Sequence, residues 1–476
     1  MRVPWLIDPA MKDVRGRVSQ SRDEAFDALV IGAGAGGMAA AARLNRLGYR
    51  TLLAEGRDRV GGRASTVEID GFRVNTGALI SETGGENGKL FDELGVPMGT
   101  RLPARPLVLR LGKRDVPVMN GVIGAVLKTL VALLGITARR FPGLRPSPER
   151  TLADVTLRRG PFVRGLMRNL TSALFAAEPA DVRAALLFDY LTKPKALDTY
   201  AMHPEGSIGP WQALADQFQH TGGVLWLNSE VTRLTFDDAG RVDGAIVRRD
   251  GRDVSVRVGV VVSNAGPVST VRMCGDENLP TGYAERIRAQ SAPSTLITVN
   301  FASRWPLTTV PGVVFFGPTR RLAYAANLTE TCPEMAPPGW HLYAGASTPH
   351  PATGAFDEAT EIEMLKADLA EHFPGFEMAK ILSVQICAGE DWPAQRAIAG
   401  RDLPQTTPIP NLFNVGDGVR AWATAGQSGC VQSARLVVER IAAQFPALAG
   451  AKAVDPVRWL RGPAMWFDGK NQLSFG

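Results

Sequence analysis

The chain has 476 residues, 45% of them hydrophobic and 21% charged, which is the composition of a globular protein long enough for more than one domain. Its net charge of +6 is a mild basic surplus that suits an anionic surface and gives no indication of nucleic-acid binding. The 4 cysteines and 5 histidines form no spaced cluster, so we expect free thiols in a reducing compartment, a cytoplasmic protein and no metal site.

A glycine-rich segment near the N-terminus has the pattern of a dinucleotide site. Residues 1–24 are polar, lack the apolar run of a secretory signal and are expected to form an arm. An apolar run at 28–31 then predicts a buried strand, and Gly32, Gly34 and Gly37 follow it in the spacing G-x-G-x-x-G. These glycines would permit a tight turn, close approach of a pyrophosphate and close packing of the next helix, whose N-terminus offers N–H groups to phosphates.

An acidic residue and a second glycine motif extend this pattern. A strand at 51–54 ends in Glu55, about 20 residues beyond the glycines, where a carboxylate accepts hydrogen bonds from ribose hydroxyls. The segment 59–66, RVGGRAST, adds a glycine pair that lets another group approach the backbone and two arginines that can neutralise a diphosphate. The residues therefore predict a dinucleotide cofactor.

The segment 59–66 resembles the R-x-G-G-R-x-x-[ST] signature of flavoproteins with a glycine doublet, a superfamily that includes amine oxidases, protoporphyrinogen oxidases and phytoene desaturases. The resemblance covers roughly 26–76, 204–267 and 411–440, and it implies FAD as the cofactor. No Cys or His lies between 392 and 401, where some amine oxidases attach the flavin, so we expect non-covalent FAD. The residues expected to hold FAD are Gly32, Gly34, Gly36, Gly37, Glu55, Gly56, Arg57, Gly61, Gly62, Arg63, Gly77, Val231, Asn264, Gly416, Asp417, Ser428, Gly429 and Cys430.

Hairpins and an apolar run come next along the chain. Asp70-Gly71 lies between two segments of alternating hydrophobic and polar residues and so predicts a hairpin, and Gly112-Lys113 predicts another. The run at 122–136 is too short for a membrane span and contains Lys128. It is either a buried or cap helix beside a solvated basic face, or an interfacial helix on anionic lipid. Residues 151–200 have helical periodicity.

From residue 222 onward, segments in which hydrophobic and polar residues alternate dominate. The segments 224–227, 231–236, 242–248 and 254–262 predict strands, and they resemble the three-stranded meander of flavoprotein Rossmann domains, in which the residue matching Val231 contacts adenine. A second set of strands between 296 and 387, with a helix at 358–373, predicts an antiparallel sheet with a covering helix.

A segment near the C-terminus predicts the other half of the cofactor site. A strand at 412–415 leads to Gly416-Asp417, and a long helix opens at 425–429. Asp417 can hydrogen-bond ribityl hydroxyls, and the N-terminus of the helix can stabilise negative charge on a reduced flavin ring. The aromatic tail at 449–476 would either wrap the body or touch a membrane.

These segments predict an α/β fold. We expect a discontinuous Rossmann-type FAD-binding domain at 25–105, 215–290 and 395–448. An α+β substrate domain, with an antiparallel sheet and a helical cap, would occupy 106–214 and 291–394.

Two further segments resemble the phytoene desaturase branch. Residues 425–434 resemble its terminal glycine motif, with Ser428 in place of the usual proline, and 203–207 resemble its Pro-x-Gly-Gly loop near flavin and substrate. The candidate catalytic or substrate-lining residues are His203, Glu205, Ser207 and Trp422. Surface-loop roles remain open for His203 and Glu205, and Trp422 can equally be a packing residue or a cavity wall. Thr298 stands where amine oxidases usually carry a lysine that holds a water at the flavin.

Three functions remain open. The first is hydride removal from an apolar substrate, isoprenoid or polycyclic, to flavin N5, with a quinone or oxygen as electron acceptor and optional peripheral contact with an anionic membrane. Because the chain has a single G-x-G-x-x-G fingerprint, direct use of a nicotinamide is not expected. The second is an amine oxidase, which Thr298 disfavours, and the third is a non-redox lipid-binding escort of the same fold.

Overall fold

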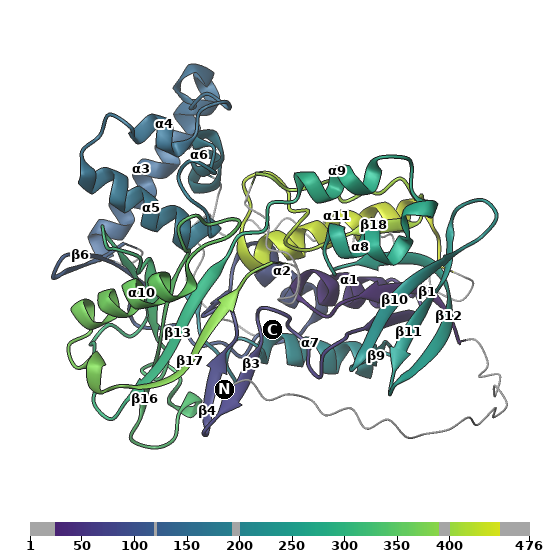
Figure 1. The fold of residues 1–476 in the computed structure, drawn as a ribbon, viewed down its shortest axis with the longest axis horizontal. Coiled ribbons are helices and arrows are strands. Elements are labelled where there is room, and N and C mark those ends of the chain that lie inside the picture. The colour runs from purple at the N-terminus through teal and green to yellow at the C-terminus, as the bar shows by residue number, and fades with distance from the viewer. Residues whose placement is uncertain (1–23, 119–120, 193–199, 390–399, 448–476) are drawn as a thin grey trace, which may run out of the picture.

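The computed structural model describes residues 24–118, 121–192, 200–389 and 400–447, which form two seven-stranded sheets, two short two-stranded sheets and a helical cap (Figure 1). The predicted tail and the predicted arm lie outside the described residues, except for Glu24, which begins strand β1.

The first sheet carries the dinucleotide fingerprint. Its strand order is β10-β11-β12-β1-β2-β9, and β18 pairs with β12. Strand β1 pairs in parallel with both β2 and β12, whereas β10, β11 and the first half of β12 form an antiparallel meander. The strands are β1 Glu24–Ile31, β2 Thr51–Ala54, β9 Val224–Trp226, β10 Ser229–Phe236, β11 Val242–Arg249, β12 Arg252–Ser263 and β18 Leu412–Asn414.

Both faces of β1 are buried, as a central parallel strand requires. Ala28 and Val30 face one core, and Leu29 and Ile31 face another. The small side chains of α1 let this helix contact α11 closely. The helices α1 Ala35–Arg46, α2 Gly85–Leu94, α7 Gly209–His220 and α11 Gly426–Gln444 contribute to the first core, and α8 Pro267–Cys274 contributes to the second, with α9 Tyr283–Gln290 packed against α8.

The second sheet is mostly antiparallel. Its order is β17-β13-β16-β15-β14-β6-β7, and only the β14–β6 pair among these described strands is parallel. Helix α10 Glu358–His372 covers one face, where Phe301 stacks on Tyr343 with ring centroids 5.3 Å apart. The strands are β6 Leu107–Leu111, β7 Arg114–Pro117, β13 Leu296–Ser303, β14 Val313–Phe316, β15 Tyr324–Asn327, β16 His341–Ser347 and β17 Lys380–Cys387.

Four helices form a cap that rises from one side of the body (Figure 1). They are α3 Gly121–Arg140, α4 Leu152–Thr156, α5 Pro161–Phe175 and α6 Ala184–Thr192. The cap has its own apolar core, which includes Phe175 and Leu186 and extends to Ala425 at the start of α11. None of the helices in the described parts of the chain combines the length and the apolarity that crossing a membrane requires.

The predicted fold class is confirmed: a parallel Rossmann-type sheet with a meander, a separate mostly antiparallel sheet and a helical cap. The hairpins at Asp70-Gly71 (β3 Thr66–Ile69 and β4 Phe72–Asn75) and at Gly112-Lys113 (β6 and β7) are present. One expected boundary differs. Residue 215 lies inside α7, and Trp211 and Leu214 of this helix belong to the core of the first sheet, so the whole of α7 belongs with that sheet. Residues 193–199 of the expected helical segment lie outside the described residues.

Candidate active site

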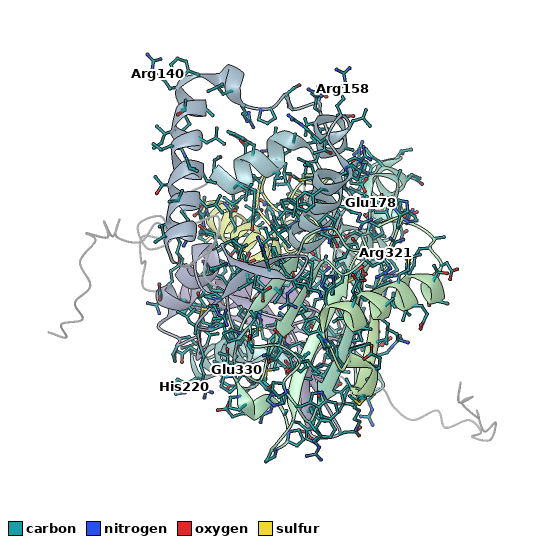
Figure 2. The ribbon with its side chains drawn as sticks, turned by 90° about the vertical axis from the view of Figure 1, so that its left-hand side faces the viewer. Arg140, Arg158, Glu178, His220, Arg321 and Glu330 are labelled. Atoms are coloured by element: carbon teal, nitrogen blue, oxygen red, sulfur yellow. The ribbon has the colours of Figure 1, made fainter. Side chains whose placement is uncertain are left out.

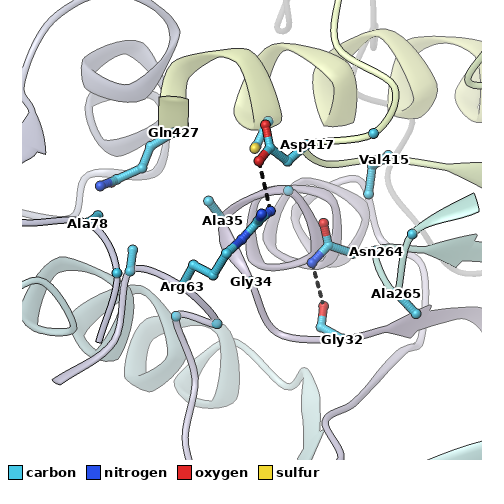
Figure 3. Close-up of a pocket in the computed structure, with 18 of the residues that line it drawn as sticks. Gly32, Gly34, Ala35, Arg63, Ala78, Asn264, Ala265, Val415, Asp417 and Gln427 are labelled. Carbon is cyan, nitrogen blue, oxygen red and sulfur yellow. Dashed lines mark hydrogen bonds and ion pairs between the residues drawn. The ribbon is translucent and has the colours of Figure 1, made fainter. Parts of the chain in front are cut away.

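A cavity of about 670 Å³ lies where the first sheet, the second sheet and the cap meet. Gly32 of the β1–α1 turn and Val231 of β10 line one end, and Leu296 of β13 and Leu174 of α5 line the other. The start of α11 lies beside it, with Gln427 directed toward Ala78 (Figure 3). The cavity therefore joins the dinucleotide fingerprint to the substrate sheet and the cap.

Most of the predicted FAD residues share this cavity. Those that line it are Gly32, Gly34, Gly36, Glu55, Gly56, Arg57, Gly61, Gly62, Arg63, Gly77, Val231, Asn264, Asp417 and Cys430. The remaining four, Gly37, Gly416, Ser428 and Gly429, are not among its described lining residues and support its walls instead. The amide of Gly416, for example, donates a hydrogen bond of 2.9 Å to Ser433 Oγ.

The glycine turn leaves room that side chains would fill. A Cβ atom on Gly34 would lie 2.7 Å from Asn264 Nδ2, and one on Gly37 would lie 1.9 Å from the carbonyl oxygen of Gly32. Gly32 itself has φ +88°, which favours glycine. Asn264 Nδ2 donates to the Gly32 carbonyl at 3.4 Å and holds the turn against β12 (Figure 3). The N-terminus of α1 is thus open for a phosphate group.

Glu55 lies at the end of β2 beside this turn. Its carboxylate accepts hydrogen bonds from the backbone N–H groups of Ala33 at 2.6 Å and Arg57 at 2.9 Å. Burial raises the pKa of Glu55 above its ordinary value, although these two hydrogen bonds oppose the shift. The carboxylate is therefore fixed in place next to the glycine turn, as the ribose contact of a dinucleotide fingerprint requires.

A buried ion-pair network closes the opposite wall. Arg63 Nη2 lies 2.9 Å from Asp417 Oδ2 (Figure 3). Arg420 Nη1 lies 2.6 Å from Asp417 Oδ1. Arg420 Nε also contacts Asp402 at 3.0 Å. Burial of the Arg420 guanidinium opposes its charge, but Asp417 and Asp402 outweigh burial and raise its pKa above the ordinary value. Two arginines thus hold Asp417 at the cavity wall.

The residues present fit FAD. Arg63 Nη1 is buried and has no hydrogen-bond partner within the described chain, so it is available to an anionic or carbonyl group in the cavity. The open glycine turn would take the diphosphate, Glu55 the ribose and the Arg63–Asp417 pair the ribityl and ring end. Cys430 also lines the cavity, but burial raises its pKa to about 12, so its thiol is neutral at pH 7 and no nucleophile.

The first turn of α11 already has an acidic partner, which the sequence did not predict. The backbone N–H of Ser428 donates to Glu82 Oε2 at 3.1 Å, so a carboxylate already contacts the helix N-terminus that was expected to face the flavin ring. Glu82 belongs to the short strand β5 Ser81–Glu82 and lines the cavity. Sequence reasoning missed this residue because no motif surrounds it and α11 lies 346 residues further along the chain.

The four predicted catalytic residues are absent from the described lining of the cavity. Ser207 is buried, and its Oγ donates to the carbonyl of Ser65 at 2.9 Å, which fixes the loop after the glycine doublet. His203 Nδ1 accepts the N–H of Glu205 at 2.9 Å, and burial lowers the pKa of His203. Glu205 is exposed and pairs with Arg73 at 3.2 Å. This loop supports the flavin-binding segments from outside.

Trp422 and Thr298 also lie beside the cavity rather than in it. Trp422 Nε1 donates to Asp189 Oδ2 at 2.8 Å and so ties the segment after Asp417 to cap helix α6. Thr298 is fully buried in β13, and its hydroxyl has no partner within the described residues. Leu296, two residues earlier on the same strand, lines the cavity instead.

The end of the cavity away from the glycine turn is largely apolar and aromatic. Its lining includes Leu79, Ile80, Ala173, Leu174, Tyr190, Tyr200, Leu296, Phe315 and Tyr324. Phe315 and Tyr324 meet edge to face with centroids 6.1 Å apart. Such walls favour an apolar ligand. These residues come from six helices and strands and from the loop before β5, and no local sequence pattern connects them.

Comparison with known proteins agrees with this geometry. The profile of the family described as flavin containing amine oxidoreductase matches residues 35–442. An uncharacterised protein of Methanocaldococcus jannaschii is 24% identical over 403 residues, covering 82% of this chain and 93% of that protein. A phytoene dehydrogenase of Streptomyces griseus is 25% identical over 483 residues, covering 84% of this chain and 90% of that protein.

The fold is shared with solved structures as well. An oxidoreductase of Methanosarcina mazei superposes with a TM-score of 0.73 at 24% identity, covering 87% of this chain and 100% of that one. The family profile spans both parts of the cofactor cavity, from the first turn of α1 to the last turns of α11. The chain belongs to the flavin-containing amine oxidoreductase family and is an FAD-dependent oxidoreductase.

Proposed function

We propose that this oxidoreductase removes a hydride from an apolar substrate, in the manner of a phytoene desaturase-like dehydrogenase, with non-covalently bound FAD as the acceptor. The observation that carries the proposal is the apolar and aromatic end of the cavity, where Leu174, Phe315 and Tyr324 approach from the cap and the second sheet. Likeness to the phytoene dehydrogenase over 84% of the chain supports it.

The protein's part in the reaction is to bind, orient and exclude water. FAD, when bound, supplies the two-electron acceptor for the hydride. Arg63 and Asp417 would hold the ribityl and ring end of the cofactor, and the apolar end of the cavity would position the substrate C–H bond beside it. The cap helices α5 and α6, which contribute Leu174 and Tyr190, keep solvent from that end.

Desaturation also requires removal of a proton from the neighbouring carbon. Glu82 lines the cavity among its apolar residues, next to Ile80 and the start of α11. We assign the proton to its carboxylate. Bound FAD would accept the hydride from one carbon while the Glu82 carboxylate takes the proton from the neighbouring carbon, so that the two carbons become doubly bonded.

The electron acceptor in this proposal is a quinone or oxygen, and the quinone is favoured. Strand β13, LITVNFAS, carries no lysine that could hold a water at the flavin, as amine oxidases usually do. The reason for non-covalent attachment remains the lack of Cys or His at 392–401, of which residues 392–399 lie outside the described part of the chain.

Amine oxidation is the second candidate. Glu82 favours it, because a carboxylate in an apolar pocket can pair with a substrate ammonium group. The family description points the same way. The escort alternative is disfavoured, because a non-redox protein needs neither the open glycine turn nor the Arg63–Asp417 pair.

Substituting Leu174, at the apolar end, separates the two candidates. Leu174→Asp places a charge among apolar walls and should abolish turnover of an apolar alkene or polyene, while Leu174→Met, of similar volume, should keep most of it. Turnover with a quinone acceptor is the measurement, with bound flavin measured in each variant. If Leu174→Asp instead retains or gains activity on simple amines and the wild type leaves apolar substrates unchanged, the enzyme is an amine oxidase.

A further inference from the structure

Helix α3 leaves its large apolar side chains in solvent. It contacts α6 through small residues: Gly135 and Ala138 are buried, and a Cβ on Gly135 would lie 2.9 Å from Thr192 Cβ. The opposite face is exposed. Its side chains are Val122 at 81% exposure, Val126 at 51%, Leu130 at 58%, Leu133 at 53% and Ile136 at 62%. An ordinary amphipathic helix buries such residues, so this arrangement is inverted.

The polar groups on that exposed face are satisfied within the helix. Thr129 Oγ1 donates to the carbonyl of Ala125 at 2.8 Å, and Thr137 Oγ1 donates to the carbonyl of Leu133 at 2.7 Å. Both threonines lie among the exposed apolar residues by helical spacing. Their hydroxyl protons therefore need no water, and the face can enter an apolar medium without breaking a hydrogen bond.

More exposed apolar residues continue from α3 around the tip of the cap. They are Phe141 at 58%, Leu144 at 54%, Leu157 at 68% and Phe162 at 54%. Arginines stand among them, and Arg140 and Arg158 project from the tip away from the body (Figure 2). We call this combined surface, the outer side of α3 and the tip, the cap face.

The net positive charge of the protein can be traced to this part of the chain. Residues 121–164 contain eight basic and two acidic residues, a surplus of six that equals the +6 of the whole chain, so the rest of the sequence is neutral. Arg139, Arg158 and Arg159 are exposed and form no ion pair with any described residue, while Arg145 pairs with Asp189. An apolar face ringed by unpaired arginines is complementary to anionic lipid.

We infer that the cap face docks on the surface of an anionic lipid bilayer. The exposed side of α3 lies in the interface, and the arginines contact lipid headgroups. A second copy of the chain is a poor occupant, because two such surfaces would bring their surplus positive charges together.

Docking places the active site close to the bilayer. Helix α5 begins at the tip, near the exposed Phe162, and ends at the cavity, where Ala173 and Leu174 form part of the wall. Helix α6 contacts α3 on one side and contributes Tyr190 to the cavity on the other. A lipid-soluble substrate would thus enter from the bilayer through the cap. This delivery role rests on the proposed function, whereas the docking does not.

Flotation of the FAD-loaded protein with vesicles tests the docking. The vesicles are phosphatidylcholine alone or phosphatidylcholine mixed with phosphatidylglycerol, at ionic strengths of about 0.01 M and about 1 M, where the Debye length is about 30 Å and about 3 Å. We expect binding to the anionic vesicles at low ionic strength. Leu130→Gln with Leu133→Gln should weaken it in both salt conditions, and the control pair Leu102→Gln and Met378→Gln, at exposed apolar sites elsewhere, should not.

Two charge variants identify the surface. The triple variant Arg139→Gln, Arg158→Gln, Arg159→Gln should bind anionic vesicles more weakly, by about fivefold for each arginine removed, at low ionic strength. The matched triple Arg233→Gln, Arg252→Gln and Arg257→Gln changes the charge equally on the exposed meander and should bind as the wild type does. Equal losses in both triples would overturn the proposal, because binding would then follow net charge alone.

The remaining outcomes also decide the question. No flotation of wild-type protein with anionic vesicles at low ionic strength overturns the proposal. So does a wild-type dimer in sedimentation that Leu130→Gln with Leu133→Gln dissociates, because the cap face would then bind a second copy. All of these readouts are independent of substrate, and an unchanged visible spectrum of bound flavin in each variant shows that the cofactor site is intact. Failure of the proposed reaction would leave them unaffected.

Discussion

Glu55 joins the end of β2 to the glycine turn through two backbone hydrogen bonds, and this double contact makes it the most informative single residue of the cofactor site. The fingerprint residues could be predicted because their requirement is local: Gly34 and Gly37 admit no Cβ atom at a fixed spacing after a strand. The loop at 203–207 could not be placed in the same way. Ser207 Oγ bonds the carbonyl of a residue 142 positions earlier, and only the folded chain shows that this turns it away from the cavity.

Glu55→Gln should weaken FAD binding about tenfold or more, because a neutral amide gives up a hydrogen bond to a charged acceptor worth about 1.5–3 kcal/mol. Titrating the apoprotein with FAD by fluorescence measures the change. The exposed Glu68, which lies outside the cavity lining, provides the control Glu68→Gln, for which no change is expected.

The same residue predicts a pH dependence. Burial raises the pKa of Glu55, so its carboxylate takes up a proton at higher pH than an exposed glutamate does. Ribose hydroxyls donate to the carboxylate, hence FAD affinity should fall as the pH falls through that raised pKa. The loss should be absent in Glu55→Gln. A wild-type affinity that stays constant across acidic pH, down to the ordinary range of glutamate, would contradict this role.

Glu82→Gln tests the proton acceptor. Glutamine keeps an oxygen for the N–H of Ser428, so the start of α11 and FAD binding should be unaffected. Loss of a general base costs about 10²–10⁴-fold in turnover. We therefore expect a fall of that order in kcat on an apolar substrate, measured with saturating FAD and quinone. Equal kcat in the wild type and Glu82→Gln would limit Glu82 to capping the helix.

At the scale of elements, β1 and α1 form a strand–turn–helix unit in which Gly34 and Gly37 have no room for a Cβ atom. The sequence predicted the strands and hairpins well, because the alternation of hydrophobic and polar residues and the Asp-Gly turns are local signals. It put the domain boundary at residue 215, inside α7, because Trp211 and Leu214 are buried by contacts with α1 and α2, which lie far away in the sequence. Likewise, the apolar run at 122–136 fits a buried helix and an interfacial one equally, and only the structure shows its large side chains exposed.

Gly37→Ala should separate α1 from β1. The new Cβ would lie 1.9 Å from the Gly32 carbonyl oxygen, so the helix must shift. This shift would move the N-terminus of α1 away from the position in which it can bind a phosphate. Overpacking of this kind costs about 1–3 kcal/mol of the free energy of unfolding. We expect a lower Tm and loss of bound flavin in the purified protein. Gly143→Ala, where a Cβ meets no atom within 4 Å, is the control, and a Gly37→Ala protein that keeps its flavin and its Tm would contradict the packing argument.

At the scale of the whole molecule, the site lies where three layers meet. The first sheet supplies the cofactor end, the second sheet and the cap supply the apolar end, and the Trp422–Asp189 hydrogen bond connects the cap to the segment that carries Asp417. The sequence predicted the first layer down to single residues. It could not predict the apolar end, because Leu174, Leu296 and Tyr324 converge from elements with no shared motif.

The central claim is that this cavity transfers a hydride from an apolar substrate to bound FAD without a nicotinamide. Anaerobic mixing of the holoprotein with candidate substrates, followed by the visible absorbance of the flavin in stopped flow, tests it directly. We predict that an apolar polyene or alkene bleaches the flavin and that a quinone then restores the absorbance. NADPH alone should leave the flavin oxidised. Rapid bleaching by NADPH, or bleaching by simple amines while apolar substrates have no effect, would contradict the claim.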